Sequence, residues 1–117
     1  MKENSIMYLV EAKVDEKDLS SLRELIKKMV DHTREEEGAL TYHWSIKDNI
    51  VHTIEHYRDN EAAKIHLDGF TQHFAKDYMN LVEVRACTVY GRPNAEVKRI
   101  LDGFGAVYRE TIDGFVR

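Results

Sequence analysis

The sequence has 117 residues, a length typical of one domain, and 43% of them are hydrophobic while 32% are charged. This balance excludes a disordered chain. The net charge of −4 argues against a nucleic-acid-binding face. No apolar run is long enough to span a membrane. The single cysteine, Cys87, excludes an internal disulfide and a multi-cysteine zinc site. The first residues lack the apolar segment of a signal peptide, so we expect a cytoplasmic protein.

The first third of the chain predicts a strand followed by a helix. Residues 5–14 are rich in aliphatic, aromatic and β-branched side chains, as strands are. Residues 15–38 follow helical spacing, and their leucine, isoleucine, methionine and valine side chains form one apolar stripe. We expect Asp15 to cap the start of this helix and Gly38 to end it in a left-handed turn.

The middle of the chain predicts a β-hairpin. Residues 39–46 and 50–57 are both rich in strand-forming side chains. A short polar turn joins them, and Asp48 and Asn49 are expected at its tip.

The region after the hairpin completes a repeated pattern. We expect Asp59 to cap a second helical region, Gly69 to break it into two short helices, and residues 80–91 to form the fourth strand. The element order is therefore strand-helix-strand-strand-helix-strand. With right-handed crossovers, this order predicts an α+β ferredoxin-like fold with a four-stranded antiparallel sheet and both helices on one face.

The chain divides into a ferredoxin-like domain over residues 1–92 and a C-terminal helical extension over residues 93–117. Pro93 and Asn94 are expected to start the helix of this extension, whose later part carries several large apolar side chains. Because water solvates such a segment poorly, we expect it to pack on its own domain or on a partner chain.

The strands predict apolar side chains on both faces of the sheet. In the first strand, Met7 and Leu9 point away from the face that its other apolar residues share. Two helices can cover only one face, so we expect a second copy of the sheet to cover the other and form a homodimer. Parity along the strands places three charged residues on that second face: Glu11, Glu83 and Arg85. They are expected to pair across the dimer or to lie at its wet rim.

Several motifs carry a resemblance to a known family. They are Gly38 before a strand, Glu55, Tyr57, Asp59 and Ala62 or Ala63 at the third strand and helix start, the pairs His66-Leu67 and His73-Phe74, and a closing VYGRP. Over about residues 5–91 this pattern resembles the antibiotic biosynthesis monooxygenase family. The resemblance is moderately specific for the fold and weakly specific for the reaction.

The resemblance implies a homodimer of ferredoxin-like subunits, called a dimeric α/β barrel. It also implies a monooxygenase that oxidises a quinol or a small polyphenolic substrate with O2, without a flavin, metal or haem cofactor. In that chemistry an electron-rich phenolate or hydroquinone anion itself passes an electron to O2. The protein supplies an apolar pocket, a group that takes the phenol proton, and donors that hold the resulting anion.

His66 is the predicted catalytic residue, because it lies among apolar neighbours and matches the family histidine. With an ordinary pKa of about 6.5, it could bind or deprotonate the substrate. Eight further residues are predicted to line the substrate pocket: Tyr42, Trp44, Glu55, Tyr57, Phe70, His73, Phe74 and Tyr78. Each has a structural alternative, since His66 could bond to the backbone or to Glu55, and the aromatic rings could be plain core.

A metal site is not predicted. His66 and His73 are seven residues apart, about 10 Å along a helix. His52 and His56 are four apart on a strand, about 13 Å. Because zinc–nitrogen bonds are about 2 Å long, neither pair can chelate one ion by itself.

Two alternatives to a cofactor-independent monooxygenase stay open. One is a non-catalytic dimer that binds a small aromatic molecule or serves as a stress accessory protein. The other is the haem-degrading branch, which resembles this chain less. Its asparagine, tryptophan and axial histidine would fall at Asn4, His66 and Tyr78, and two of these three depart from the pattern.

Overall fold

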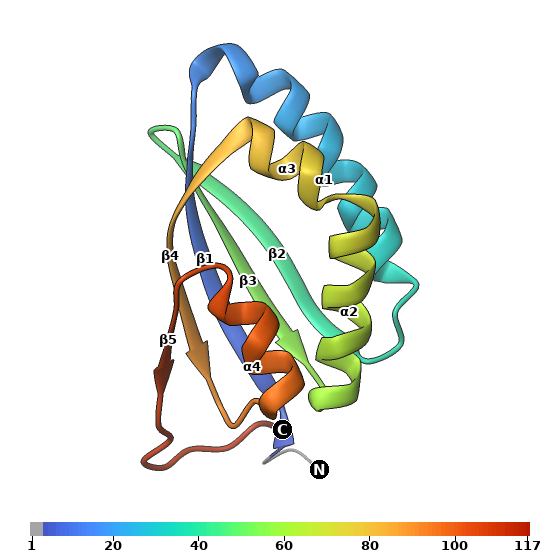
Figure 1. Ribbon diagram of the computed structural model, residues 1–117, viewed down its shortest axis with the longest axis vertical. Coiled ribbons are helices and arrows are strands. Elements are labelled where there is room, and N and C mark those ends of the chain that lie inside the picture. The colour runs from blue at the N-terminus through green and yellow to red at the C-terminus, as the bar shows by residue number, and fades with distance from the viewer. Residues whose placement is uncertain (1–3) are drawn as a thin grey trace.

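The computed structural model describes residues 4–117, so the first three residues of the predicted domain lie outside the described part. The strands are β1 (Ile6–Val14), β2 (Ala39–Lys47), β3 (Ile50–Tyr57), β4 (Val82–Tyr90) and β5 (Ala106–Arg109). The helices are η2 (Glu16–Asp18), a 3₁₀ turn, then α1 (Leu19–Arg34), α2 (Asn60–His73), α3 (Ala75–Leu81) and α4 (Ala95–Asp102). All helices lie on one side of the sheet (Figure 1). Within residues 4–117, no helix has the length and apolar character needed to cross a membrane.

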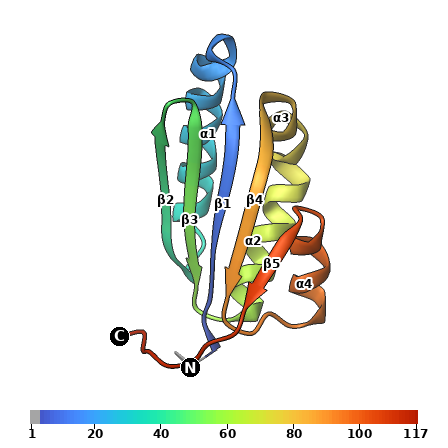
Figure 2. The same ribbon diagram turned by 90° about the vertical axis from the view of Figure 1, so that its left-hand side faces the viewer.

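The α+β ferredoxin-like arrangement is present, but the sheet has five strands in the described residues rather than the predicted four. The strand order is β2-β3-β1-β4-β5, seen from the helix-free side in Figure 2. The first four strands pair antiparallel, whereas β5 runs parallel to β4. The prediction of a wholly antiparallel sheet is therefore wrong at this edge. The parallel pairing arises because α4 carries the chain back along the sheet, so that the short strand β5 enters in the same direction as β4.

Three local signals in the sequence are confirmed. Asp48 and Asn49 form the hairpin tip with φ of 50° and 64°, the left-handed conformation that such a turn requires. The Asp59 side chain accepts a hydrogen bond from the backbone N–H of Ala62 at 2.9 Å and so caps α2. Asn94 caps α4 in the same way.

Two glycines act differently from their predicted roles. Helix α1 ends at Arg34, and Gly38 is not left-handed; a Cβ there would overlap the Cβ of Ala62. Helix α2 runs through Gly69, where a Cβ would lie 3.1 Å from the His32 ring. Both glycines therefore permit close approach between elements, and the helical region breaks at Phe74 instead.

The predicted cap at Asp15 is also wrong, and the regular alternation assumed along the fourth strand does not hold past Val84. Asp15 makes no capping hydrogen bond, because η2 delays the start of α1 to Leu19. In β4 the register against β1 shifts so that Arg85 is an extra, bulged residue. A bulge moves later side chains to the opposite face, so Val84 and Cys87 both face the helices.

The three charged residues expected on the second face of the sheet have partners within the chain. Glu11 Oε1 lies 2.9 Å from His52 Nε2, and Glu83 Oε1 lies 3.4 Å from Arg85 Nη2. Two core clusters fill the space between the sheet and the helices on the opposite face, one towards α2 and α4 and the other towards α1 and α3.

Candidate functional site

A cavity lies between the sheet and helices α2, α3 and α4. Its volume is about 30 Å³, which is room for one or two water molecules, so an aromatic ligand would enter only if the side chains of the wall moved apart. Its walls are Tyr8, Val10, Tyr42, Trp44, Thr53, Glu55, His66, Leu67, Phe70, Tyr78, Leu101 and Phe104. Most of these are aromatic or aliphatic, so the ionisable groups Glu55 and His66 stand out in an apolar surface.

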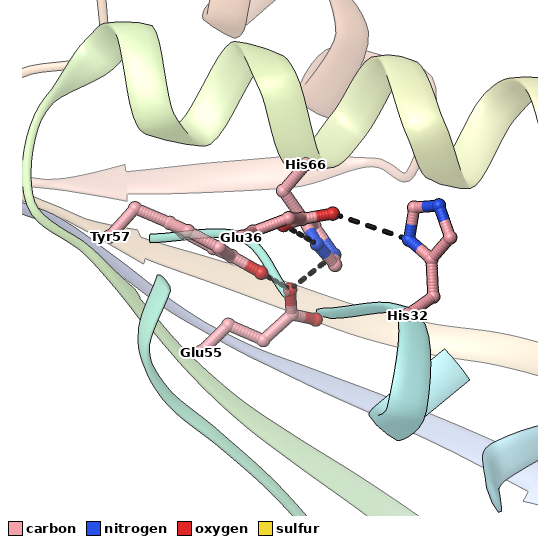
Figure 3. A network of polar contacts seen from close by, with 5 residues as sticks. All are labelled: His32, Glu36, Glu55, Tyr57 and His66. Atoms are coloured by element: carbon pink, nitrogen blue, oxygen red, sulfur yellow. Dashed lines mark hydrogen bonds and ion pairs between the residues drawn. The ribbon is translucent and has the colours of Figure 1, made fainter. Parts of the chain in front are cut away.

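His66 is held between two carboxylates (Figure 3). Its Nδ1 lies 2.9 Å from Glu36 Oε1, and its Nε2 lies 3.3 Å from Glu55 Oε1. Tyr57 donates its hydroxyl to the same Glu55 oxygen at 2.6 Å, and His32 Nδ1 lies 3.4 Å from the other oxygen of Glu36. The His66 and Glu55 side chains are only 6% and 9% exposed, so this pair is almost wholly shielded from water, while His32 at the edge of the network is 40% exposed.

The network fixes the charge of His66. Burial lowers the pKa of this histidine, but hydrogen bonds and charge interactions with Glu36 and Glu55 outweigh burial and raise it to about 9. At neutral pH the ring therefore carries both protons, donates a hydrogen bond from Nδ1 to Glu36 and forms an ion pair through Nε2 with Glu55. Two carboxylates and one imidazolium leave the cluster with a net charge of −1, and no lysine or arginine among residues 4–117 lines the cavity.

Local sequence features bring the three residues together. The cap at Asp59 starts α2 so that His66 falls on its buried side, next to Leu67 and one turn from Ala62. Glu36 comes from the segment between α1 and β2. Gly38, which has no side chain, lets that segment lie against α2 at Ala62. Close packing at Gly38 therefore places Glu36 beside His66.

Every tyrosine around the Glu55 carboxylate resists ionisation. Burial raises the pKa of Tyr8, Tyr42, Tyr57 and Tyr78, and the charge of Glu55 raises each of them further. This environment keeps a phenol protonated.

Two hydrogen-bond donors in the cavity wall have no partner among the described residues. They are the hydroxyl of Tyr8 and the indole Nε1 of Trp44, both buried. The Tyr8 hydroxyl lies close enough to Glu55 and Tyr57 for both to shift its pKa, but it makes no hydrogen bond of good geometry to either. A buried donor without a partner is costly, so each of these groups calls for an explanation.

The structure brings together most of the predicted site residues. The cavity wall includes His66, Tyr42, Trp44, Glu55, Phe70 and Tyr78. Three others do not line it. Tyr57 lies behind it, stacked on the His66 ring at 4.9 Å, while His73 is exposed and Phe74 packs against His32. The break at Phe74 turns these last two side chains away from the cavity.

Sequence reasoning missed Glu36 and six residues of the cavity wall, which are Tyr8, Val10, Thr53, Leu67, Leu101 and Phe104. Tyr8 shares the buried parity of β1, and this signal could have found it. Glu36 is one of three consecutive glutamates, and nothing in the sequence distinguishes it from its neighbours. Leu101 and Phe104 come from the C-terminal extension, which packs against α2 and closes one side of the cavity.

Among residues 4–117, no cluster of three or more histidine, cysteine, aspartate or glutamate side chains could hold a metal ion.

The fold and the cavity together define a ferredoxin-like protein with a small, largely aromatic pocket beneath its helices. Residues 5–84 match the family model of the antibiotic biosynthesis monooxygenases, and the chain belongs to this family. No curated protein matches the sequence.

Solved structures show the same fold at low sequence identity. MupZ from Pseudomonas fluorescens is 21% identical with a TM-score of 0.84, covering 100% of this chain and 91% of MupZ. A conserved protein from Methanosarcina mazei Go1 is 18% identical with a TM-score of 0.67, covering 77% of this chain and 94% of that protein. A variant of SnoaB, a cofactor-independent oxygenase from Streptomyces nogalater, is 14% identical with a TM-score of 0.64, covering 79% and 96%. Of these three likenesses, the one to MupZ extends over the C-terminal helix and β5 as well.

Proposed function

We propose that this protein is a cofactor-independent monooxygenase that oxidises a quinol or another small aromatic hydroxyl compound with O2. One observation carries the proposal: a buried carboxylate, Glu55, is held at the wall of an aromatic cavity by His66 and Tyr57. Both contacts use the Oε1 atom of Glu55, and Figure 3 shows its other oxygen without a partner in the network. We expect that oxygen to accept the substrate hydroxyl, in competition with the nearby hydroxyl of Tyr8.

The proton acceptor in this scheme is Glu55 rather than His66. His66 is already protonated at neutral pH, so it cannot take the substrate proton there. Its role is to supply positive charge and to fix the orientation of Glu55. Glu36 holds the opposite side of the ring and prevents its rotation.

The reaction joins proton and electron transfer. Because the cavity keeps phenols protonated, as its own tyrosines indicate, the substrate binds as a neutral hydroxyl compound. Its proton passes to Glu55 as an electron passes to O2, and the resulting radical pair forms a carbon–oxygen bond at a ring carbon. Glu55 returns its proton to the peroxide anion, and the resulting hydroperoxide loses water together with the hydrogen of that ring carbon, so one atom of O2 stays as a new carbonyl oxygen. The other leaves as water with two hydrogens from the substrate, and O2 is the only oxidant.

We also propose that the protein acts as a homodimer whose sheets pack through their helix-free faces. One row of residues crosses that face on neighbouring strands: His43, Ile54, Leu9, Thr88 and Val107. Ile54 and Val107 are 49% and 58% exposed in the single chain, as large apolar residues seldom are without a partner. Packing of two such faces would bury this row.

A second candidate function is a non-catalytic dimer that binds a neutral aromatic molecule. The raised pKa values of the cavity tyrosines favour it, because an environment that keeps phenols protonated also makes them harder to oxidise. The two candidates therefore differ in turnover and not in binding.

The test is O2 consumption by chelator-treated protein with a panel of hydroquinones and naphthoquinols, each compared with its own autoxidation rate. The monooxygenase proposal expects a protein-dependent rate that survives chelation and transfer of one labelled oxygen atom from ¹⁸O2 to the product. Glu55→Gln removes the proton acceptor with little change in shape, and we expect it to lower this rate roughly a hundredfold. Glu37→Gln, on an exposed neighbour of the network, serves as the control.

Two results would count against the proposal. Binding of the panel without any rate above autoxidation would favour the non-catalytic candidate. Full activity in Glu55→Gln, with catalysis still present, would exclude Glu55 as the proton acceptor.

A further inference from the structure

The unpartnered donors of the cavity wall indicate what kind of ligand it takes. The Tyr8 hydroxyl and the Trp44 indole N–H are buried and line the same cavity as Glu55. Tyr8 lies near Glu55 and Tyr57, and Trp44 lies near Tyr42, but none of these contacts has the geometry of a hydrogen bond. Tyr8 is only 3% exposed, so its hydroxyl cannot turn to bulk water without movement of the core. Both groups donate hydrogen bonds, and the indole can do nothing else. The matching ligand atom is therefore an acceptor, such as a carbonyl oxygen.

Glu55 has the opposite requirement. It is a carboxylate in the same wall and accepts hydrogen bonds, so it matches a ligand hydroxyl. The cluster of Glu36, His66 and Glu55 has a net charge of −1, and the described part of the chain places no lysine or arginine in the cavity wall to offset it. A negatively charged ligand would lose its hydration without gaining a counter-charge.

We propose that Tyr8 and Trp44 are specificity residues, and that with Glu55 they select an uncharged aromatic ring bearing both a hydroxyl group and a carbonyl-type oxygen. The hydroxyl donates to Glu55, and the second oxygen accepts from the Tyr8 and Trp44 donors. Aromatic carboxylates of the same size are rejected. This inference rests on the proposed function only in placing the substrate in this cavity.

The experiment uses ligands that do not react with O2, so that binding is measured apart from turnover. The probe is para-hydroxyacetophenone, which has a hydroxyl and a carbonyl on one ring. Para-ethylphenol lacks the carbonyl, para-methylacetophenone lacks the hydroxyl, and para-hydroxybenzoate replaces the ketone with a charge. Calorimetric titration of the full-length protein at neutral pH gives the four dissociation constants.

We expect para-hydroxyacetophenone to bind roughly three- to tenfold more tightly than either truncated ligand, as one additional hydrogen bond implies. Para-hydroxybenzoate should bind more weakly than all three. Tyr8→Phe should remove most of the advantage over para-ethylphenol while leaving para-ethylphenol binding unchanged. Trp44→Phe should act in the same direction, with para-ethylphenol reporting any loss of packing. Tyr90→Phe makes the same chemical change on the helix-free face and should leave all four constants unchanged.

Stability of the unliganded protein gives a second readout. Because the Tyr8 hydroxyl has no partner among the described residues, its removal should leave the melting temperature unchanged or raise it. An unchanged ligand preference in both Tyr8→Phe and Trp44→Phe would overturn the proposal and leave bound water as their partner. Equal or tighter binding of para-hydroxybenzoate would overturn its charge argument. Selective binding without turnover of any quinol would refute the proposed function but not this inference.

Discussion

Replacement of Glu36 by glutamine tests the charge state of His66, on which the proposed chemistry depends. Glu36 Oε1 lies 2.9 Å from His66 Nδ1 in a buried network, and a glutamine at this position would keep the shape of the side chain while removing its charge. The native pKa of His66 is about 9, compared with an ordinary value of 6.5. A difference of this size corresponds to about 3 kcal/mol in the free energy of unfolding.

The sign of the pH dependence follows from the raised pKa. Because His66 binds its proton more tightly in the folded state, the stabilisation is complete below about pH 6.5 and is lost as the pH rises through about 9. In Glu36→Gln only the Glu55 carboxylate remains beside the ring. We therefore expect a lower pKa for His66 and a free energy of unfolding reduced by roughly 1.5–3 kcal/mol at pH 6, the contribution of one charge-assisted hydrogen bond. The difference from wild type should shrink above about pH 9.

Urea unfolding across this pH range measures the stability change, and the NMR shift of the His66 ring protons measures the pKa directly. Glu37→Gln, an exposed neighbour in the same segment, is the matched control and should behave as wild type. A wild-type His66 that titrates near 6.5 would refute the reasoning. An equal loss of stability at every pH would show that Glu36 acts through packing alone.

Two further predictions concern the fold and the assembly. Gly38→Ala should destabilise the protein by roughly 1–3 kcal/mol in urea unfolding, because the new Cβ meets Ala62. Adding Ala62→Gly to this variant should recover part of the lost stability. If no stability is recovered, contact with Ala62 is not the cause of the loss. Ile54→Lys should shift the protein from dimer to monomer in light scattering after size exclusion, because it puts a charge into the proposed interface. Ile65→Lys, on the exposed side of α2, should leave the mass unchanged. A dimer retained in both variants would contradict the proposed interface.

Local features of the sequence predicted the elements with the strongest signals. The β2–β3 hairpin follows from two strand-like runs and the Asp48-Asn49 turn, all within about twenty residues. The start of α2 follows from the Asp59 cap. These signals act between near neighbours, so the sequence alone displays both partners of each interaction. The same holds for the aromatic character of the pocket, since Tyr42 and Trp44 share one face of one strand.

The errors arose where the partner of a residue lies far along the chain. Gly38 and Gly69 resemble helix breakers in sequence, yet their roles depend on Ala62 and His32, which pack against them from other helices. The bulge at Arg85 is a property of the pairing between β4 and β1, and alternation within β4 does not reveal it.

The sequence by itself predicted the fold family and placed His66 among apolar neighbours, because both rest on residue types and short-range spacing. Only the tertiary structure decided which groups surround His66. Its partners Glu36 and Glu55 are 30 positions away and on a separate strand, and they reverse its expected chemistry from a neutral base to a buried cation. Charge state depends on which groups surround a side chain once water is excluded, and that arrangement exists only when the chain is folded.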